Sequence, residues 1–225
     1  MALIVKICGL STPEALDVAL AAGADMVGFV FFPPSPRNIS YEAARLLGAR
    51  VEGRAKKVAL TVDADDAAFD AIVRSLQPDL LQLHGKEPPA RVSALKRRFG
   101  LPVMKAIAVE TSADLSAIAT YTAVADRLLF DARAPRDATR PGGLGKTFDW
   151  RVLERLEPSV PFMLSGGLSA NNVAEALRIT TAPGVDVSSG VERAPGEKDH
   201  DKIRAFVRAA REAARATGKP VTSPA

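Results

Sequence analysis

Two side chains that can transfer protons each follow a short apolar segment. Cys8 ends the stretch at residues 3–8, which only Lys6 interrupts, and Asp131 follows the Leu-Leu-Phe segment at 128–130. A thiolate acts as a base or a nucleophile, and a carboxylic acid supplies the complementary proton. Facing each other, the two groups would perform acid–base catalysis. Apart, Cys8 would be a small buried hydrophobe and Asp131 would cap a turn.

Three glycine-rich segments have the composition of a phosphate site. Small residues let backbone N–H groups approach an anion, whereas singly such glycines would only make tight turns. Their combination favours a phosphate site built from several loops. The candidate residues are Ser165, Gly166 and Gly167 in one segment, Ser188, Ser189 and Gly190 in another, and Gly145 in segment 141–146, which we expect to form a mobile lid.

Two further polar residues have positions suited to substrate binding. Arg37 lies in residues 33–38, which contain three prolines. Such a stiffened loop would hold the guanidinium for a bidentate contact with a substrate carboxylate, although an exposed surface arginine fits the same pattern. His84 ends another apolar segment, where either a role in the site or a structural hydrogen bond suits a histidine.

These residues follow short apolar segments that alternate with longer helical ones. Eight such pairs fit the 225 residues, and about 28 residues per pair matches a compact closed barrel of parallel strands. We therefore predict an α/β fold, a single-domain (β/α)8 TIM barrel over residues 1–217, with 218–225 as a flexible tail. The rival open, doubly wound sheet lacks its G-x-G-x-x-G fingerprint after the first strand.

In such a barrel the candidate residues lie at the C-terminal strand ends or in the loops that follow, where barrel enzymes place their active sites. The predicted strands are residues 3–8, 26–31, 57–62, 79–84, 102–107, 127–131, 161–165 and 185–188. The predicted helices are residues 13–22, 41–51, 65–76, 89–99, 112–121, 150–156, 170–179 and 199–217.

Local patterns place some helix ends and faces. Ser11 and Glu14 have capping-box spacing before the first helix, and Ser40 precedes the second as an N-cap. In the last helix the apolar residues recur at helical spacing. Its arginine row, which we expect to be solvated, consists of Arg204, Arg208, Arg211 and Arg215.

Composition excludes several classes of protein. A formal net charge of +4 with interspersed signs, one Trp and two Tyr argue against a nucleic-acid partner. One cysteine excludes an internal disulfide, and two histidines leave little for a metal site, so we predict neither. The first apolar stretch is too short for a membrane span or a signal peptide. A cytoplasmic protein without membrane contact is the expectation.

The sequence resembles the phosphoribosylanthranilate isomerase family from residue 5 to about residue 206. The order and spacing of the shared segments are specific, because neighbouring phosphate-binding barrels share the glycine-rich cradle but not this pair of cysteine and aspartate. The segments are VKICG at 5–9, GFVF at 28–31, SPR at 35–37, LQLHG at 81–85, LFD at 129–131, GKTFDW at 145–150, LSGGL at 164–168 and VDVSSGVE at 185–192.

This resemblance implies a barrel of the ribulose-phosphate-binding type and a reaction without a metal or organic cofactor. The family converts N-(5-phosphoribosyl)anthranilate into 1-(2-carboxyphenylamino)-1-deoxyribulose 5-phosphate, an Amadori rearrangement in tryptophan biosynthesis. Asp131 would be the general acid that protonates the ring oxygen. Cys8 would be the general base that removes the proton from ribose C2.

The resemblance also implies how the substrate binds. Arg37 would pair with the anthranilate carboxylate, Asp186 and His84 would orient polar groups, and the three glycine-rich segments would bind the phosphate. The partner is then a small phosphorylated molecule, and the protein a monomer or a homodimer. The loop at 133–140 departs from the family by being longer and more basic than a minimal version.

Two other functions fit parts of this pattern. The related isomerase of histidine biosynthesis performs the same rearrangement, but it uses two aspartates, and Cys8 occupies the position of one of them. A non-catalytic sensor of a phosphorylated ligand would need only the glycine-rich cradle. The presence of Cys8, Asp131 and Arg37 together argues against a sensor.

Overall fold

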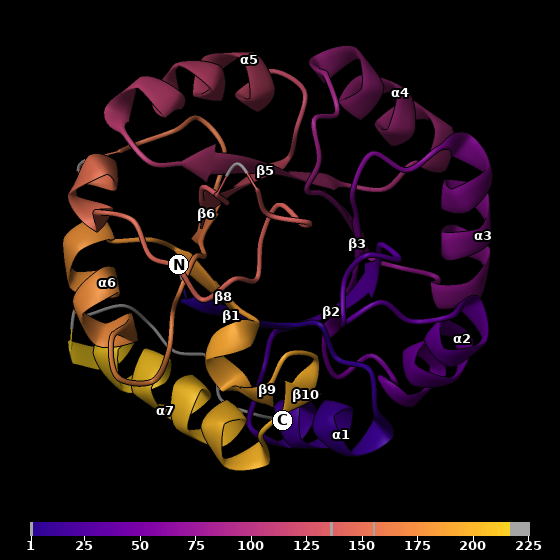
Figure 1. Cartoon of the computed structure of the whole chain (residues 1–225), viewed down its shortest axis with the longest axis horizontal. Coiled ribbons are helices and arrows are strands. Elements are labelled where there is room, and N and C mark those ends of the chain that lie inside the picture. Colours follow the sequence, from indigo (N-terminus) through magenta and orange to yellow (C-terminus); the bar gives the residue numbers. More distant parts are fainter. Residues whose placement is uncertain (1, 136, 155, 217–225) are drawn as a thin grey trace.

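The computed structural model describes residues 2–135, 137–154 and 156–216. Eight parallel strands form a closed barrel in which neighbours follow the order of the sequence, and helices surround it (Figure 1). The first strand pairs with both the second and the eighth, which closes the barrel. The predicted single-domain TIM barrel is thus confirmed. The tail predicted at 218–225 lies outside the described residues.

The barrel strands begin and end close to their predicted limits. They are β1 (Ile4–Cys8), β2 (Met26–Phe31), β3 (Lys56–Thr61), β4 (Leu80–Leu83), β5 (Val103–Val109), β6 (Arg127–Ala132), β7 (Phe162–Leu164) and β8 (Gly184–Val187). The α-helices are α1 (Pro13–Ala21), α2 (Tyr41–Arg50), α3 (Asp66–Leu76), α4 (Pro89–Phe99), α5 (Ile118–Thr122), α6 (Val173–Thr180) and α7 (His200–Ala216). Within the described ranges, no helix is long and apolar enough to cross a membrane.

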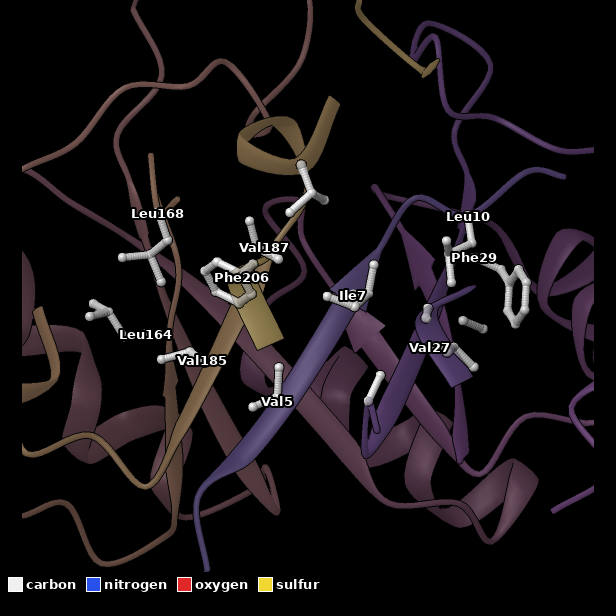
Figure 2. Close-up of a cluster of buried hydrophobic side chains, with 14 of the residues drawn as sticks. Val5, Ile7, Leu10, Val27, Phe29, Leu164, Leu168, Val185, Val187 and Phe206 are labelled. Atoms are coloured by element: carbon white, nitrogen blue, oxygen red, sulfur yellow. The ribbon is translucent and has the colours of Figure 1, made fainter. Parts of the chain in front are cut away.

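Side-chain alternation along each strand separates an outer from an inner layer. Val5 and Ile7 of β1 belong to the outer apolar core together with Phe206 of α7, and Figure 2 shows them with their neighbours on β2 and β8. The inner positions at the N-terminal end are apolar as well. Toward the C-terminal end the inner layer becomes polar and stays buried, with Lys6, Gln82, Asp131, Ser165 and Asp186. The barrel thus carries its polar interior at one end.

Two predicted helices are shorter or tighter in the structure. Where a helix was predicted at 150–156, the described residues form a 3₁₀ turn, η2 (Trp150–Leu153), which ends at an extended Glu154. Segment 112–121 begins as a 3₁₀ turn, η1 (Ser112–Ala117), before α5. Both predictions of a full helix were wrong.

A short hairpin after the barrel was not predicted. It follows the 3₁₀ turn η3 (Ser189–Val191) and consists of β9 (Glu192–Ala194) and β10 (Glu197–Lys198). Its strands are too short and too charged to show an alternating pattern. Its turn contains Gly196 with a φ of +87°, a left-handed conformation that favours glycine.

The start of α1 differs from the prediction by one residue. Thr12, not Ser11, is the N-cap, and its hydroxyl accepts a hydrogen bond from the Ala15 N–H. Pro13 therefore occupies the first helical position, where its missing N–H is harmless. Ser40 caps α2 as predicted, accepting from the Ala43 N–H at 3.1 Å.

The arginine row of α7 is not solvated throughout. Arg204, Arg208 and Arg215 are exposed, but Arg211 is buried. Its guanidinium donates to the carbonyl oxygens of Leu3 and Gly23 and pairs with Asp25 at 2.7 Å. Arg211 therefore ties the last helix to the residue before β1 and to the turn before β2.

We expect Arg211→Ala to lower the free energy of unfolding by about 2–3 kcal/mol, because two carbonyls and a carboxylate lose their donor. Urea denaturation measures the change. Arg208→Ala, on the exposed side of α7, is the matched control and should stay within about 0.5 kcal/mol of the wild-type protein. Equal effects of the two substitutions would contradict a structural role for Arg211.

Candidate active site

The C-terminal ends of the barrel strands surround a cavity. Barrel enzymes place their ligand sites at this end. All the predicted site residues except Gly190 line it. They are Cys8, Arg37, His84, Asp131, Gly145, Ser165, Gly166, Gly167, Asp186, Ser188 and Ser189.

Gly190 lies behind the cavity wall. A Cβ atom on this residue would come within 1.8 Å of the Leu168 carbonyl oxygen. The glycine thus lets the loop after β8 pack directly on the loop after β7. It supports the two phosphate-type loops and is not part of the cavity surface.

Two buried charges, Lys6 and Asp186, act on Cys8. The Lys6 ammonium donates to Asp186 at 2.7 Å, and Lys6 is 0% exposed. Burial raises the pKa of the Cys8 thiol above its ordinary value, although the Lys6 charge opposes this. Burial would lower the pKa of Lys6, but Asp186 and Cys8 outweigh it and hold that pKa above its usual range. Lys6 is therefore an ammonium ion.

Asp131 takes part in a chain of side-chain hydrogen bonds. His84 Nε2 lies 3.1 Å from Asp131 Oδ2, and His84 Nδ1 lies 3.1 Å from Gln82 Nε2. Gln82 is fully buried on β4. The chain fixes the imidazole ring and links the protonation of Asp131 to the tautomer of His84.

Arg37 is buried, with its side chain only 4% exposed. Its Nε and Nη2 atoms each donate to the Glu192 carboxylate at 2.7 Å, and Nη2 also donates to the Gly143 carbonyl. Lys198 binds the same carboxylate at 2.7 Å from the other strand of the hairpin. A bidentate contact is thus present, but with a protein carboxylate. The third guanidinium nitrogen, Nη1, lies next to Gly143.

Both cations act on the protonation of Glu192. Burial alone would raise the pKa of this carboxyl, but Arg37 and Lys198 overcome it and keep the pKa below its ordinary value. Burial lowers the pKa of Lys198, against the pull of Glu192. Glu192 is therefore ionised at neutral pH, and it is the anion that holds Arg37 in place.

Segment 141–146 lies across the cavity mouth. A Cβ on Gly142 would come within 2.5 Å of Asp131 Oδ2 and 2.9 Å of His84 Nε2. A Cβ on Gly167, which has a φ of +62°, would meet Lys146 and Thr147 at the other end of the segment. The glycines thus allow the segment to contact the cavity wall directly. Its mobility stays a prediction.

The comparisons with known proteins agree on one family. A family model described as N-(5'phosphoribosyl)anthranilate (PRA) isomerase matches residues 5–209. The chain belongs to this isomerase family. A relative from Bradyrhizobium sp. (strain ORS 278), named N-(5'-phosphoribosyl)anthranilate isomerase, is 71% identical over 213 residues, which are 95% of this chain and 97% of that protein.

Solved structures of the isomerase family have the same fold. The phosphoribosyl anthranilate isomerase of Thermotoga maritima superposes with a TM-score of 0.84 at 35% identity, covering 93% of this chain and 99% of that one. A second isomerase structure has a TM-score of 0.80 at 32% identity, with the same coverage. It is a complex with reduced 1-(o-carboxyphenylamino)-1-deoxyribulose 5-phosphate.

Four residues near the site of this family member did not emerge as candidates from the sequence. Lys6 and Gln82 each stand two residues before a predicted site residue on the same strand, so the period of two was an available signal. Glu192 and Lys198 approach Arg37 from the unpredicted hairpin, and Glu192 is 155 residues away in sequence. No local pattern reveals that contact.

The part of the chain that the structure describes contains no group of three or more His, Cys, Asp and Glu side chains that could hold a metal ion. The side chains around the cavity instead offer the thiol of Cys8, the carboxyl group of Asp131 beside the His84 imidazole, and the Arg37 guanidinium, which Glu192 holds in place. These groups suit proton transfer on a bound anion.

We expect Glu192→Gln to lower the free energy of unfolding at neutral pH by about 3 kcal/mol, because Arg37 and Lys198 would then be two buried cations without an anion. Glu197→Gln in the same hairpin removes an exposed partner of Arg193, and should change it by no more than about 0.5 kcal/mol.

The effect of Glu192→Gln should also depend on pH. Because the folded state lowers the pKa of Glu192, its contribution is complete above the ordinary carboxyl value of about 4.3 and is lost as the pH falls through the folded value. Urea titrations should therefore show the two proteins converging below about pH 4. A difference that stays constant into acid would contradict the charge-based role.

Proposed function

We propose that this protein catalyses the rearrangement of N-(5'-phosphoribosyl)anthranilate to 1-(2-carboxyphenylamino)-1-deoxyribulose 5-phosphate in tryptophan biosynthesis. The observation that carries the proposal is the single cavity where a thiol, a carboxyl group, a held arginine and small-residue loops meet. Membership of the isomerase family supports it. The cytoplasmic location and the state as monomer or homodimer stay predictions.

The substrate has two anionic ends, and the cavity has two matching regions. Its phosphate would bind among Gly145, Ser165, Gly166, Gly167, Ser188 and Ser189, whose backbones can approach an anion closely. Its carboxylate would bind at the Nη1 side of Arg37. Since Glu192 already binds the Nε side, the guanidinium is oriented before the substrate arrives, which reduces the entropy lost on binding.

Asp131 would act as the general acid. It would protonate the furanose ring oxygen, so that the ring opens to a protonated Schiff base. When protonated, Asp131 can donate a hydrogen bond to His84 Nε2 only if Nδ1 carries the imidazole hydrogen. Turning the Gln82 amide so that its oxygen accepts from Nδ1 produces that tautomer. We assign His84 this supporting position beside the acid, as a residue that orients polar groups.

Cys8 would act as the general base on the following step. The Cys8 thiolate takes the proton from ribose C2, the electron pair of the C–H bond moves toward the iminium nitrogen, and an enolamine forms. The adjacent iminium makes this proton acidic. The enolamine then tautomerises to the ketone, and Asp186 would orient the polar groups of the substrate beside Cys8.

The assay follows the fluorescence of phosphoribosylanthranilate generated in the cuvette. Wild-type protein should consume it rapidly. Cys8→Ser and Asp131→Asn should each lower kcat by about 10²- to 10⁴-fold, the usual contribution of a general acid or base. The variants should fold normally by near-ultraviolet circular dichroism.

Asp137→Asn is the matched control for Asp131→Asn, because Asp137 is an exposed carboxylate in the same loop region. It should retain wild-type activity. Consumption by the wild-type protein no faster than the spontaneous background would contradict the proposed function. Full activity in both site variants would contradict the assigned acid and base.

A further inference from the structure

Lys6 is a charged side chain in the middle of the barrel. It is 0% exposed and ranks among the largest fully buried side chains of the described residues. An ammonium ion is costly to bury unless it is paired and hydrogen-bonded. Asp186 accepts from one of its three N–H groups, at 2.7 Å. The Cys8 sulfur is the second group that acts on the ammonium.

The geometry of β1 brings this ammonium to Cys8. Lys6 and Cys8 are two residues apart on one strand, so both side chains lie on the inner face. Gly28 of β2 is the register partner of Cys8. A Cβ on Gly28 would lie 2.8 Å from Cys8 Sγ and 3.1 Å from Lys6 Nζ. The missing side chain therefore leaves one space that the sulfur and the ammonium share.

The charged groups that act on Cys8 come from three strands. Lys6 of β1 and Lys198 of β10 favour the thiolate, whereas Asp186 of β8 disfavours it. Lys198 is already engaged by Glu192 and by Ser188. Lys6 exerts the larger stabilising effect of the two lysines. Lys6 is thus the main group that offsets the cost of burying the Cys8 thiolate.

We propose that Lys6 is a positioning residue that stabilises the thiolate form of Cys8 against its burial and so favours proton abstraction by the sulfur. The inference rests on the proposed function for its role in catalysis. In the step itself the C2–H bond breaks and an S–H bond forms, and the electron pair moves to the iminium nitrogen. Lys6 keeps its own protons throughout.

The test measures the ionisation of Cys8 without substrate. Cys8 is the only cysteine in the chain, so the rate of alkylation by iodoacetamide across a pH series reports its thiolate directly. In Lys6→Met the apparent pKa of the thiol should rise by about one unit, which slows alkylation about tenfold at pH 8. In Asp186→Asn, which keeps the lysine and removes the opposing charge, alkylation should become faster than in the wild-type protein.

Lys105→Met is the matched control. Lys105 is also a buried lysine, but it pairs with Glu87 at 3.0 Å and binds the carbonyls of residues that follow β4. Removing its charge should leave the alkylation profile of Cys8 unchanged. If Lys6→Met does not fold, Lys6→Gln replaces it, with the same expected slowing of alkylation.

Two outcomes overturn the role of Lys6. One is an alkylation profile of Lys6→Met that superimposes on the wild-type profile. The other is slower alkylation in Asp186→Asn. Removing either charge would then slow alkylation, which points to general damage to the site and not to an electrostatic effect on the thiolate. If Lys6→Met is an active isomerase and its alkylation profile is unchanged, only the role of Lys6 is rejected. If the alkylation profiles shift as expected but the wild-type protein turns over no phosphoribosylanthranilate, the proposed function is rejected.

Discussion

Pairing of buried charges is the constraint on which the C-terminal end of this barrel depends. Lys6 pairs with Asp186, Arg37 and Lys198 share Glu192, and Lys105 pairs with Glu87. A buried charge without its partner would destabilise the fold. Each pair therefore dictates which strands and loops must lie together at this end.

These pairs connect parts of the chain that are far apart in sequence. The Lys6–Asp186 pair joins β1 to β8 across 180 residues, and the Arg37–Glu192 pair joins the loop after β2 to the terminal hairpin across 155 residues. Arg37 in turn donates to the carbonyl of Gly143 in the segment over the cavity. The Arg37 contacts thus join the loop after β2, the hairpin and the segment over the cavity before any ligand binds.

The sequence alone was sufficient to predict the barrel, and all but one of the residues predicted for the site line the cavity. Parallel strands place their C-terminal ends at one rim, so residues such as Cys8 and Asp131 meet there once the strands are recognised. Lys6 was not predicted as a site residue because a lysine interrupts the apolar segment there. The alternation of side chains along a strand nevertheless places it on the same face as Cys8. Thr12 could have been identified as the cap of α1 from Pro13, which prefers the first helical position.

Other features depend on tertiary contacts that no local pattern encodes. Arg211 lies in a row with three exposed arginines, and only the approach of α7 to the β1–β2 connection decides that it is buried. Glu192 comes close to Arg37 only because the hairpin of β9 and β10 folds back over the barrel end. A side chain at Gly190 would clash with the Leu168 carbonyl, so this glycine lets two loops pack together. Its predicted contact with the phosphate stays a prediction.

The most direct measurement uses substrate that carries deuterium at ribose C2. Removal of this atom by the Cys8 thiolate predicts a primary kinetic isotope effect in single turnover and a large loss of the rate of deuterium removal in Cys8→Ser. Removal of the deuterium by Cys8→Ser at the wild-type single-turnover rate would contradict base catalysis at Cys8, since another group would then take the atom.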